Sequence, residues 1–184
     1  MLGIAITGYK RPAFGLESQI AKLASTGGFS DSLISDINAT RQFNFAGRNV
    51  EANGYCRWTG ANMLQCSGAG EISWSLHPAF DEAQKSTVLR VKKNGMDKRL
   101  KIEKQEELPV IFEGQPVTAT KIAYRVKGAV GLLTKSEGSN ILVAYFVTAD
   151  VRGRYVSCML SHWTSDYIND DGLPALPGAI MKLK

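Results

Sequence analysis

The chain has 184 residues, a formal net charge of +5, 44% hydrophobic residues and 21% charged residues. This balance excludes wholesale disorder, and the length suits one domain whose core needs neither metals nor a dense disulfide net. No run approaches the roughly 18 apolar residues of a membrane-spanning helix, and residues 1–7 lack the features of a signal peptide. We therefore expect a soluble chain with no transmembrane segment and no retained signal peptide.

Helical periodicity gives way to strand periodicity after Thr40. Apolar residues at helical spacing predict short helices over residues 16–24 and 30–39. From Phe43 onward the hydrophobic period is two, which is typical of half-buried strands. We therefore expect an α+β fold over residues 1–184, one domain with a mainly antiparallel β-sheet built from hairpins and one or two short N-terminal helices. The expected divisions are a helical part over 1–40, the sheet over 41–163 and a mostly irregular tail over 164–184.

Three turns are expected to close the hairpins of this sheet. The first is a three-residue loop over 60–62, and the second is the pair Asn94-Gly95, the strongest short-range hairpin signal. The third is a four-residue loop over 150–153. It sets Val147 opposite Val156, and we place this hairpin at the centre of the sheet. Each register gathers apolar residues on one face, which supports it.

The cysteines are the most informative residues. In the first hairpin Cys56 and Cys66 lie directly opposite one another, with Cβ atoms close enough for a disulfide after a small adjustment. The alternative is a pair of reduced cysteines in the core. Cys158 sits in the middle of an apolar strand, which predicts a buried free thiol.

Basic residues crowd the second hairpin, over 90–104. In the expected register Arg90, Lys92, Arg99 and Lys101 share its outer face. Such a ribbon suits an acidic protein or a phosphate backbone, whereas the alternative is a solvated edge on which lysines prevent aggregation. This hairpin has no aromatic residues for base stacking, so nucleic acid is the less favoured partner.

An acidic stretch near the C-terminus contains Asp166, Asp170 and Asp171. Ile168 occupies a position that needs an oxygen ligand in an EF-hand, so we interpret the stretch as a solvated loop or a contact surface for a basic partner. The two histidines, His77 and His162, have no metal-binding spacing. We therefore predict no metal, no cofactor and no catalytic residue.

The favoured function follows from this missing chemistry and from the expected disulfide. It is an exported, periplasmic or secreted, non-enzymatic protein-binding module, such as an inhibitor or an immunity protein that neutralises a toxin enzyme. One alternative is a hydrolase with a loop-borne Asp, Glu or His site. Another is a binder of nucleic acid or anionic surfaces through the 90–104 hairpin. A cytoplasmic location would apply if Cys56 and Cys66 were reduced, and the oligomeric state is left open.

Overall fold

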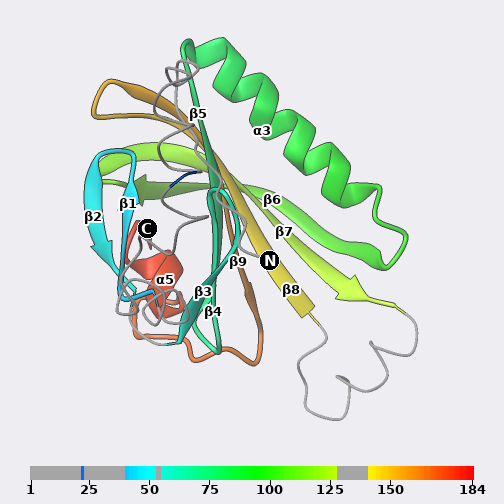
Figure 1. Cartoon of the computed structure of the whole chain (residues 1–184). Coiled ribbons are helices and arrows are strands. Elements are labelled where there is room, and N and C mark those ends of the chain that lie inside the picture. Colours follow the sequence, from blue (N-terminus) through cyan, green and yellow to red (C-terminus); the bar gives the residue numbers. More distant parts are fainter. Residues whose placement is uncertain (1–21, 23–39, 53–54, 128–140) are drawn as a thin grey trace.

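A large antiparallel sheet dominates the computed structural model, which describes residues 22, 40–52, 55–127 and 141–184. Its eight strands follow the order β10-β6-β7-β8-β9-β5-β4-β3 (Figure 1). The strands are β3 (Cys56–Gly60), β4 (Met63–Cys66), β5 (Gly70–His77), β6 (Leu100–Phe112), β7 (Gln115–Val126), β8 (Ile141–Val151), β9 (Arg154–Trp163) and β10 (Met181–Leu183). Two further strands, β1 (Gln42–Phe45) and β2 (Arg48–Glu51), form a separate hairpin, and the helices are α3 (Phe80–Gly95) and α5 (Ala175–Gly178).

The expected α+β class with a mainly antiparallel sheet is confirmed at this level. The helices predicted over 16–24 and 30–39 lie outside the described residues, except for Lys22, which is helical.

The two faces of the sheet are covered differently. Helix α3 lies diagonally across one face, while the β1-β2 hairpin and α5 lie on the other side (Figure 1). The larger apolar cluster is on the side away from α3, where Phe45, Trp74 and Phe112 pack edge to face. A smaller cluster around Ile122, Phe146 and the α3 residue Val91 lies beneath the helix.

The hairpin predicted at Asn94-Gly95 is wrong. Residues Phe80–Gly95 form helix α3, so Leu89 does not pair with Leu100. The side chain of Asn94 donates to the carbonyl of Arg90 at 3.0 Å, and Gly95 ends the helix, so this pair is a helix terminus and not a strand turn. The next hairpin turn along the chain is at Glu113-Gly114, where both residues have positive φ and β6 reverses into β7.

The β8-β9 hairpin is central, as the sequence predicts, but its register differs. Arg152 and Gly153 form a two-residue turn with φ of 55° and 72°, values that suit a tight hairpin. Val147 therefore pairs with Cys158, not with Val156. The shift is two residues, so every side chain keeps its expected face.

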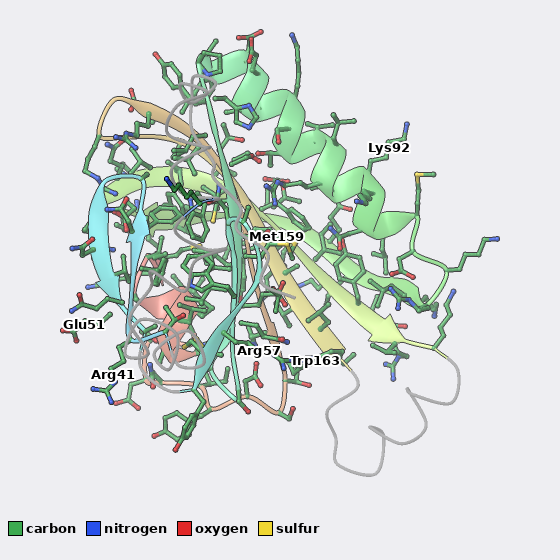
Figure 2. All side chains as sticks on the ribbon, viewed as in Figure 1. Arg41, Glu51, Arg57, Lys92, Met159 and Trp163 are labelled. Atoms are coloured by element: carbon green, nitrogen blue, oxygen red, sulfur yellow. A yellow bond between two sulfur atoms is a disulfide. The ribbon has the colours of Figure 1, made fainter. Side chains whose placement is uncertain are left out.

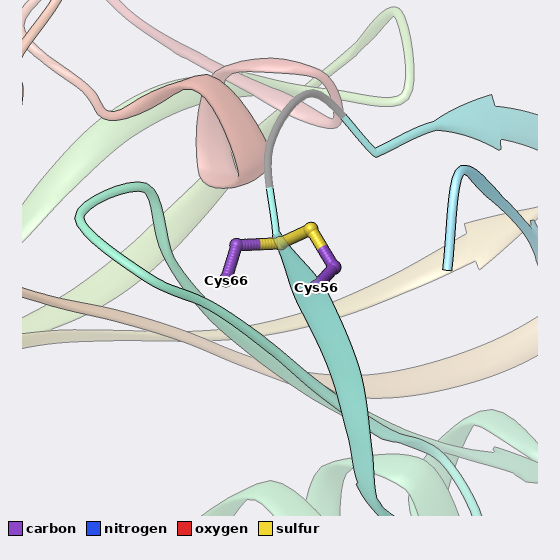
Figure 3. The surroundings of a disulfide bond; sticks show 2 residues. All are labelled: Cys56 and Cys66. Carbon is purple, nitrogen blue, oxygen red and sulfur yellow. A yellow bond between two sulfur atoms is a disulfide. The ribbon is translucent and has the colours of Figure 1, made fainter. Parts of the chain in front are cut away.

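The β3-β4 hairpin contains the disulfide predicted from the sequence. Cys56 pairs with Cys66 in the register, their Cα atoms are 4.0 Å apart, and their sulfur atoms are bonded (Figure 3). The turn is shorter than expected, because Gly60 already belongs to β3 and an irregularity between Trp58 and Gly60 absorbs the extra residue.

The C-terminal tail is more ordered than expected. It forms the short helix α5 and then β10, which pairs with β6 and completes one edge of the sheet. Ile180 and Met181 are buried. Helix α5 has 4 residues and strand β10 has 3, so neither is long enough to show a hydrophobic period. The sequence of the tail therefore looks irregular.

Candidate binding surface on helix α3

Helix α3 faces the sheet through small and polar side chains. Ala83 and Thr87 are its buried residues. The Thr87 hydroxyl donates to Ser157 on β9 at 2.9 Å and accepts from Thr148 on β8 at 2.7 Å. A hydrogen-bonded seam of this kind satisfies buried hydroxyls but buries little apolar area. The helix is therefore attached to the sheet by polar contacts around Thr87 and by Val91, which packs on the smaller apolar cluster.

Arg90 extends the same polar seam along β5. Its guanidinium donates to Ser73 at 2.8 Å and to Ser75 at 3.3 Å, and burial lowers its pKa. Ser75 also lies 2.9 Å from the His77 ring and 3.4 Å from the Ser86 hydroxyl. These contacts tie α3 to β5 by a cationic side chain that forms no salt bridge among the described residues.

The opposite side of α3 presents apolar residues to solvent. Val88, Leu89 and Met96 are 60%, 64% and 71% exposed. They are larger and more apolar than the residues that the helix buries, so the usual distribution of a surface helix is reversed. Phe80 and Ile102 are also exposed. Phe80 also contacts the Tyr155 ring edge to face at 6.1 Å, whereas a contiguous exposed apolar patch is the kind of surface that binds other proteins.

Charged residues frame this exposed surface, which we call the α3 outer face. Two rows follow the helix at spacings of three and four residues, a pattern that places side chains on one line. The first row contains Asp81, Lys85, Val88, Lys92 and Met96, and the second contains Glu82, Ser86, Leu89 and Lys93. Acids thus lie in the first turn of the helix and lysines in the last turn.

The basic residues predicted for partner binding do not form one surface. Arg90 points into the polar seam, and Lys101 pairs with Glu103 at 3.2 Å. Arg99 pairs with Asp97 at 2.7 Å and holds the pKa of that carboxyl at about 2. Lys92 alone of the four extends from the helix into solvent (Figure 2). The four residues were expected to share a face because residues 90–93 were predicted to form a strand. These residues are helical, so Arg90 and Lys92 point in different directions.

The acidic residues predicted for partner binding lie in the C-terminal loops. Asp166 accepts from the backbone of Trp163 at 2.9 Å, and Asp171 accepts from the backbone of Leu173 at 3.2 Å. These bonds are local turn caps, and Asp170 is exposed. In the part of the chain that the structure describes, His, Cys, Asp and Glu side chains form no group of three that could hold a metal ion.

A groove of about 220 Å³ lies near the start of β5 and the end of β9. Glu71, Ser161, Trp163 and Asp166 are among the residues that line it, and burial raises the pKa of Glu71. No local sequence pattern predicts this groove, because its lining comes from strands and loops that are distant along the chain.

Two buried residues of β9, Cys158 and His162, could carry chemistry, and His162 lines the groove beside Glu71 and Asp166. Cys158 is the free buried cysteine that the sequence predicts, and burial raises the pKa of its thiol. His162 stacks on Tyr145 with ring centroids 6.1 Å apart, and burial lowers its pKa. A thiol that resists ionisation is a poor nucleophile.

Sequence reasoning missed the α3 outer face because it assigned residues 88–93 to a strand. A usable signal was present in Asp81 and Glu82 followed by Lys92 and Lys93, the charge order of a helix with its dipole complemented at both ends.

No protein-family model, no curated protein and no solved structure matches the chain. None of the helices in the described residues has the length and apolar character needed to cross a membrane.

Proposed function

We propose that this chain is a non-enzymatic protein-binding module that binds its partner through the α3 outer face. The observation that carries this proposal is the exposure of Val88, Leu89 and Met96 on a helix whose buried residues are alanine and threonine. Leaving such residues in water forgoes about 1.5–3 kcal/mol for each side chain that a partner could fully bury. The polar seam beneath the helix holds these residues outward.

The proposed location is an oxidising compartment, periplasmic or extracellular. Support comes from the Cys56–Cys66 disulfide, since such bonds are rare in reducing cytosol. Trapping thiols by alkylation in intact host cells, followed by intact-mass measurement, tests this location. An oxidised pair is the expected result, and two alkylated cysteines would contradict it.

The basic hairpin that suggested nucleic-acid binding is replaced by a helix end and a loop. Arg99 and Lys101 on this segment already pair with acids of the same chain. Glu106 likewise contacts both Lys104 and Lys121. Because these cations are neutralised, the salt-dependent attraction for phosphate that they would otherwise provide is reduced. A protein partner is therefore the better supported of the two.

Site-specific photocrosslinking tests the binding face. A photoreactive phenylalanine analogue at Leu89 is expected to give a discrete adduct in host cells, and the same analogue at Lys182, on edge strand β10, is the matched control. Adding Val88→Asp and Met96→Asp should abolish the adduct. The proposed face would be overturned if the analogue at Leu89 gave no adduct, or if the analogues at Leu89 and Lys182 gave the same adduct.

A fold control separates lost binding from lost structure. Leu89→Lys replaces an exposed residue with a good helix former and should change the free energy of unfolding by less than about 0.5 kcal/mol. Ala83→Lys places a charge in the buried seam and should unfold or strongly destabilise the helix. Thermal melts of both variants, and of the protein with Val88→Asp and Met96→Asp, show whether the adduct is lost from a folded protein.

A further inference from the structure

The α3 outer face has the charge order of a self-complementary surface. Glu82 and Lys93 are both exposed and lie about three helical turns apart on one row, with Leu89 between them. Asp81 and Lys92 have the same relationship on the neighbouring row, around Val88. Each row therefore begins with an acid and ends in lysine with an apolar residue between them, and the first row also contains Lys85, which pairs with Asp81.

Two such helices packed antiparallel satisfy both rows at once. A two-fold axis near the middle of α3 sets Glu82 against Lys93 of the second copy, and Lys93 against Glu82 of the second copy. The same axis brings Val88 and Leu89 of each copy together at the centre. Asp81 is then opposed to Lys92 of the second copy, in exchange for its exposed pair with Lys85.

Other occupants of the α3 outer face fit it less well. A parallel arrangement of two copies would set acid against acid and lysine against lysine, which is unfavourable. A uniformly acidic partner, or an anionic membrane, would be attracted by Lys92 and Lys93 but repelled by Asp81 and Glu82. The alternation of sign along one helix favours a partner with the same alternation in reverse.

We propose that the occupant of the α3 outer face is a second copy of this chain, docked antiparallel through α3 as a two-fold homodimer. This inference rests on the proposed function and names its partner. A contact centred on one helix belongs to the small, transient class of interfaces, so the dissociation constant is expected in the micromolar range or above.

Charge reversal at the two ends of one row tests the arrangement. Glu82→Lys makes both copies of the Glu82–Lys93 pair repulsive, and Lys93→Glu does the same with the opposite sign. Each variant alone is expected to dimerise about tenfold more weakly or worse. An equimolar mixture of the two variants restores both attractive pairs, so association should return. Sedimentation velocity from micromolar to millimolar concentration, at low and high salt, measures all three samples.

The matched control reverses charges away from the helix. Glu51→Lys on β2 and Lys184→Glu at the chain end are both exposed, and their mixture should associate no more than the unchanged protein. Circular dichroism of all variants confirms that they are folded. The inference is overturned if the unchanged protein stays monomeric throughout, if either single reversal leaves its dimerisation unaffected, or if the mixture fails to associate.

The mass of the Leu89 photoadduct keeps the two proposals distinguishable. Twice the chain mass supports the homodimer, whereas an adduct of another mass overturns the homodimer and leaves the protein-binding module standing. The absence of an adduct overturns the proposed binding face itself.

Discussion

The hydroxyl of Thr87 on α3 donates a 2.9 Å hydrogen bond to the hydroxyl of Ser157 on β9, between residues that are far apart in the sequence. Thr148 on β8 donates to the same Thr87 oxygen at 2.7 Å. Helix α3 is thus attached at its midpoint to two adjacent strands through hydroxyl groups, in a position where most surface helices place leucine or isoleucine.

Removing the central hydroxyl should loosen the helix without unfolding the sheet. Thr87→Val keeps the side-chain shape but leaves the Thr148 hydroxyl without its acceptor, so we expect a loss of about 1–3 kcal/mol in the free energy of unfolding. The triple variant Thr87→Val, Thr148→Val, Ser157→Ala removes the stranded polar groups together. It should lose less than the sum of the three single changes. Urea denaturation of the five proteins measures this difference, and strict additivity would contradict a shared network.

The sequence predicts the sheet well because its strands depend on a local alternation. In β5, Ile72, Trp74 and Leu76 have period two, and all three face the larger apolar cluster. The disulfide follows from the same logic, since directly opposed residues in a hairpin share a face. An even register shift at the β8-β9 turn leaves these face assignments intact.

The α3 outer face could not be predicted in this way, because its position depends on which side of the helix packs on the sheet. Leu89 and Val91 alternate with charged residues just as a strand would, and Asn94-Gly95 suits either a hairpin or a helix end. Contacts between residues distant in the sequence, such as Thr87 with Ser157, accompany the helix and are invisible to local pattern. A pattern in which small residues are buried and large ones exposed contradicts the rule on which hydrophobic periodicity relies.

The Cys56–Cys66 bond should stabilise the sheet by a modest amount. The two residues are separated by 10 positions, so the chain-entropy model gives about 2–3 kcal/mol. For a protein of this size, reduction should lower the melting temperature by about 5–10 °C. Calorimetry with and without reductant measures the change. The Cys158→Ser variant, which lacks the free thiol, serves as the control and should show the same difference.

Glu113 joins the turns of three separate hairpins. Its carboxylate is nearly inaccessible and accepts from Arg48, next to the β1-β2 turn, and from Arg152, in the β8-β9 turn. Arg152 also donates to the carbonyl of Phe45 at 2.7 Å. The β1-β2 hairpin belongs to no other sheet, so this cluster is a principal polar link between that hairpin and the body.

Neutralising Glu113 should therefore weaken the attachment of the β1-β2 hairpin, which Phe45 still anchors in the core. Glu113→Gln keeps the size of the side chain but leaves two guanidinium groups without their counter-charge. The arginines are partly exposed, so we expect a loss of about 2–3 kcal/mol, below the range for a fully buried pair. Glu51→Gln, an exposed change on the same hairpin, should cost less than about 0.5 kcal/mol. Equal effects of the two changes in chemical denaturation would show that the cluster contributes nothing.

His162 should make the stability of the fold depend on pH below neutrality. Burial lowers its pKa from the ordinary value of 6.5, with a further lowering from Lys121, while the Trp163 carbonyl and Asp166 oppose the shift. The imidazole therefore takes up a proton more readily in the unfolded chain than in the folded one. As pH falls through 6.5, the unfolded state binds more protons, and the free energy of unfolding must decrease.

The variant His162→Gln should flatten this dependence. Its absolute stability is uninformative, because the replacement alters the stacking on Tyr145 and the buried surroundings of the ring. The informative quantity is the difference between the variant and the unchanged protein in the slope of the unfolding free energy between about pH 6.5 and pH 5, because this difference cancels the contribution of carboxylates such as Glu71, whose pKa is raised by burial. His77→Gln removes the only other imidazole of the chain and is the control. If the slope survives His162→Gln and disappears with His77→Gln, the pH dependence does not come from His162 and the prediction is wrong. In that case the buried His162 must already take up its proton in the folded state.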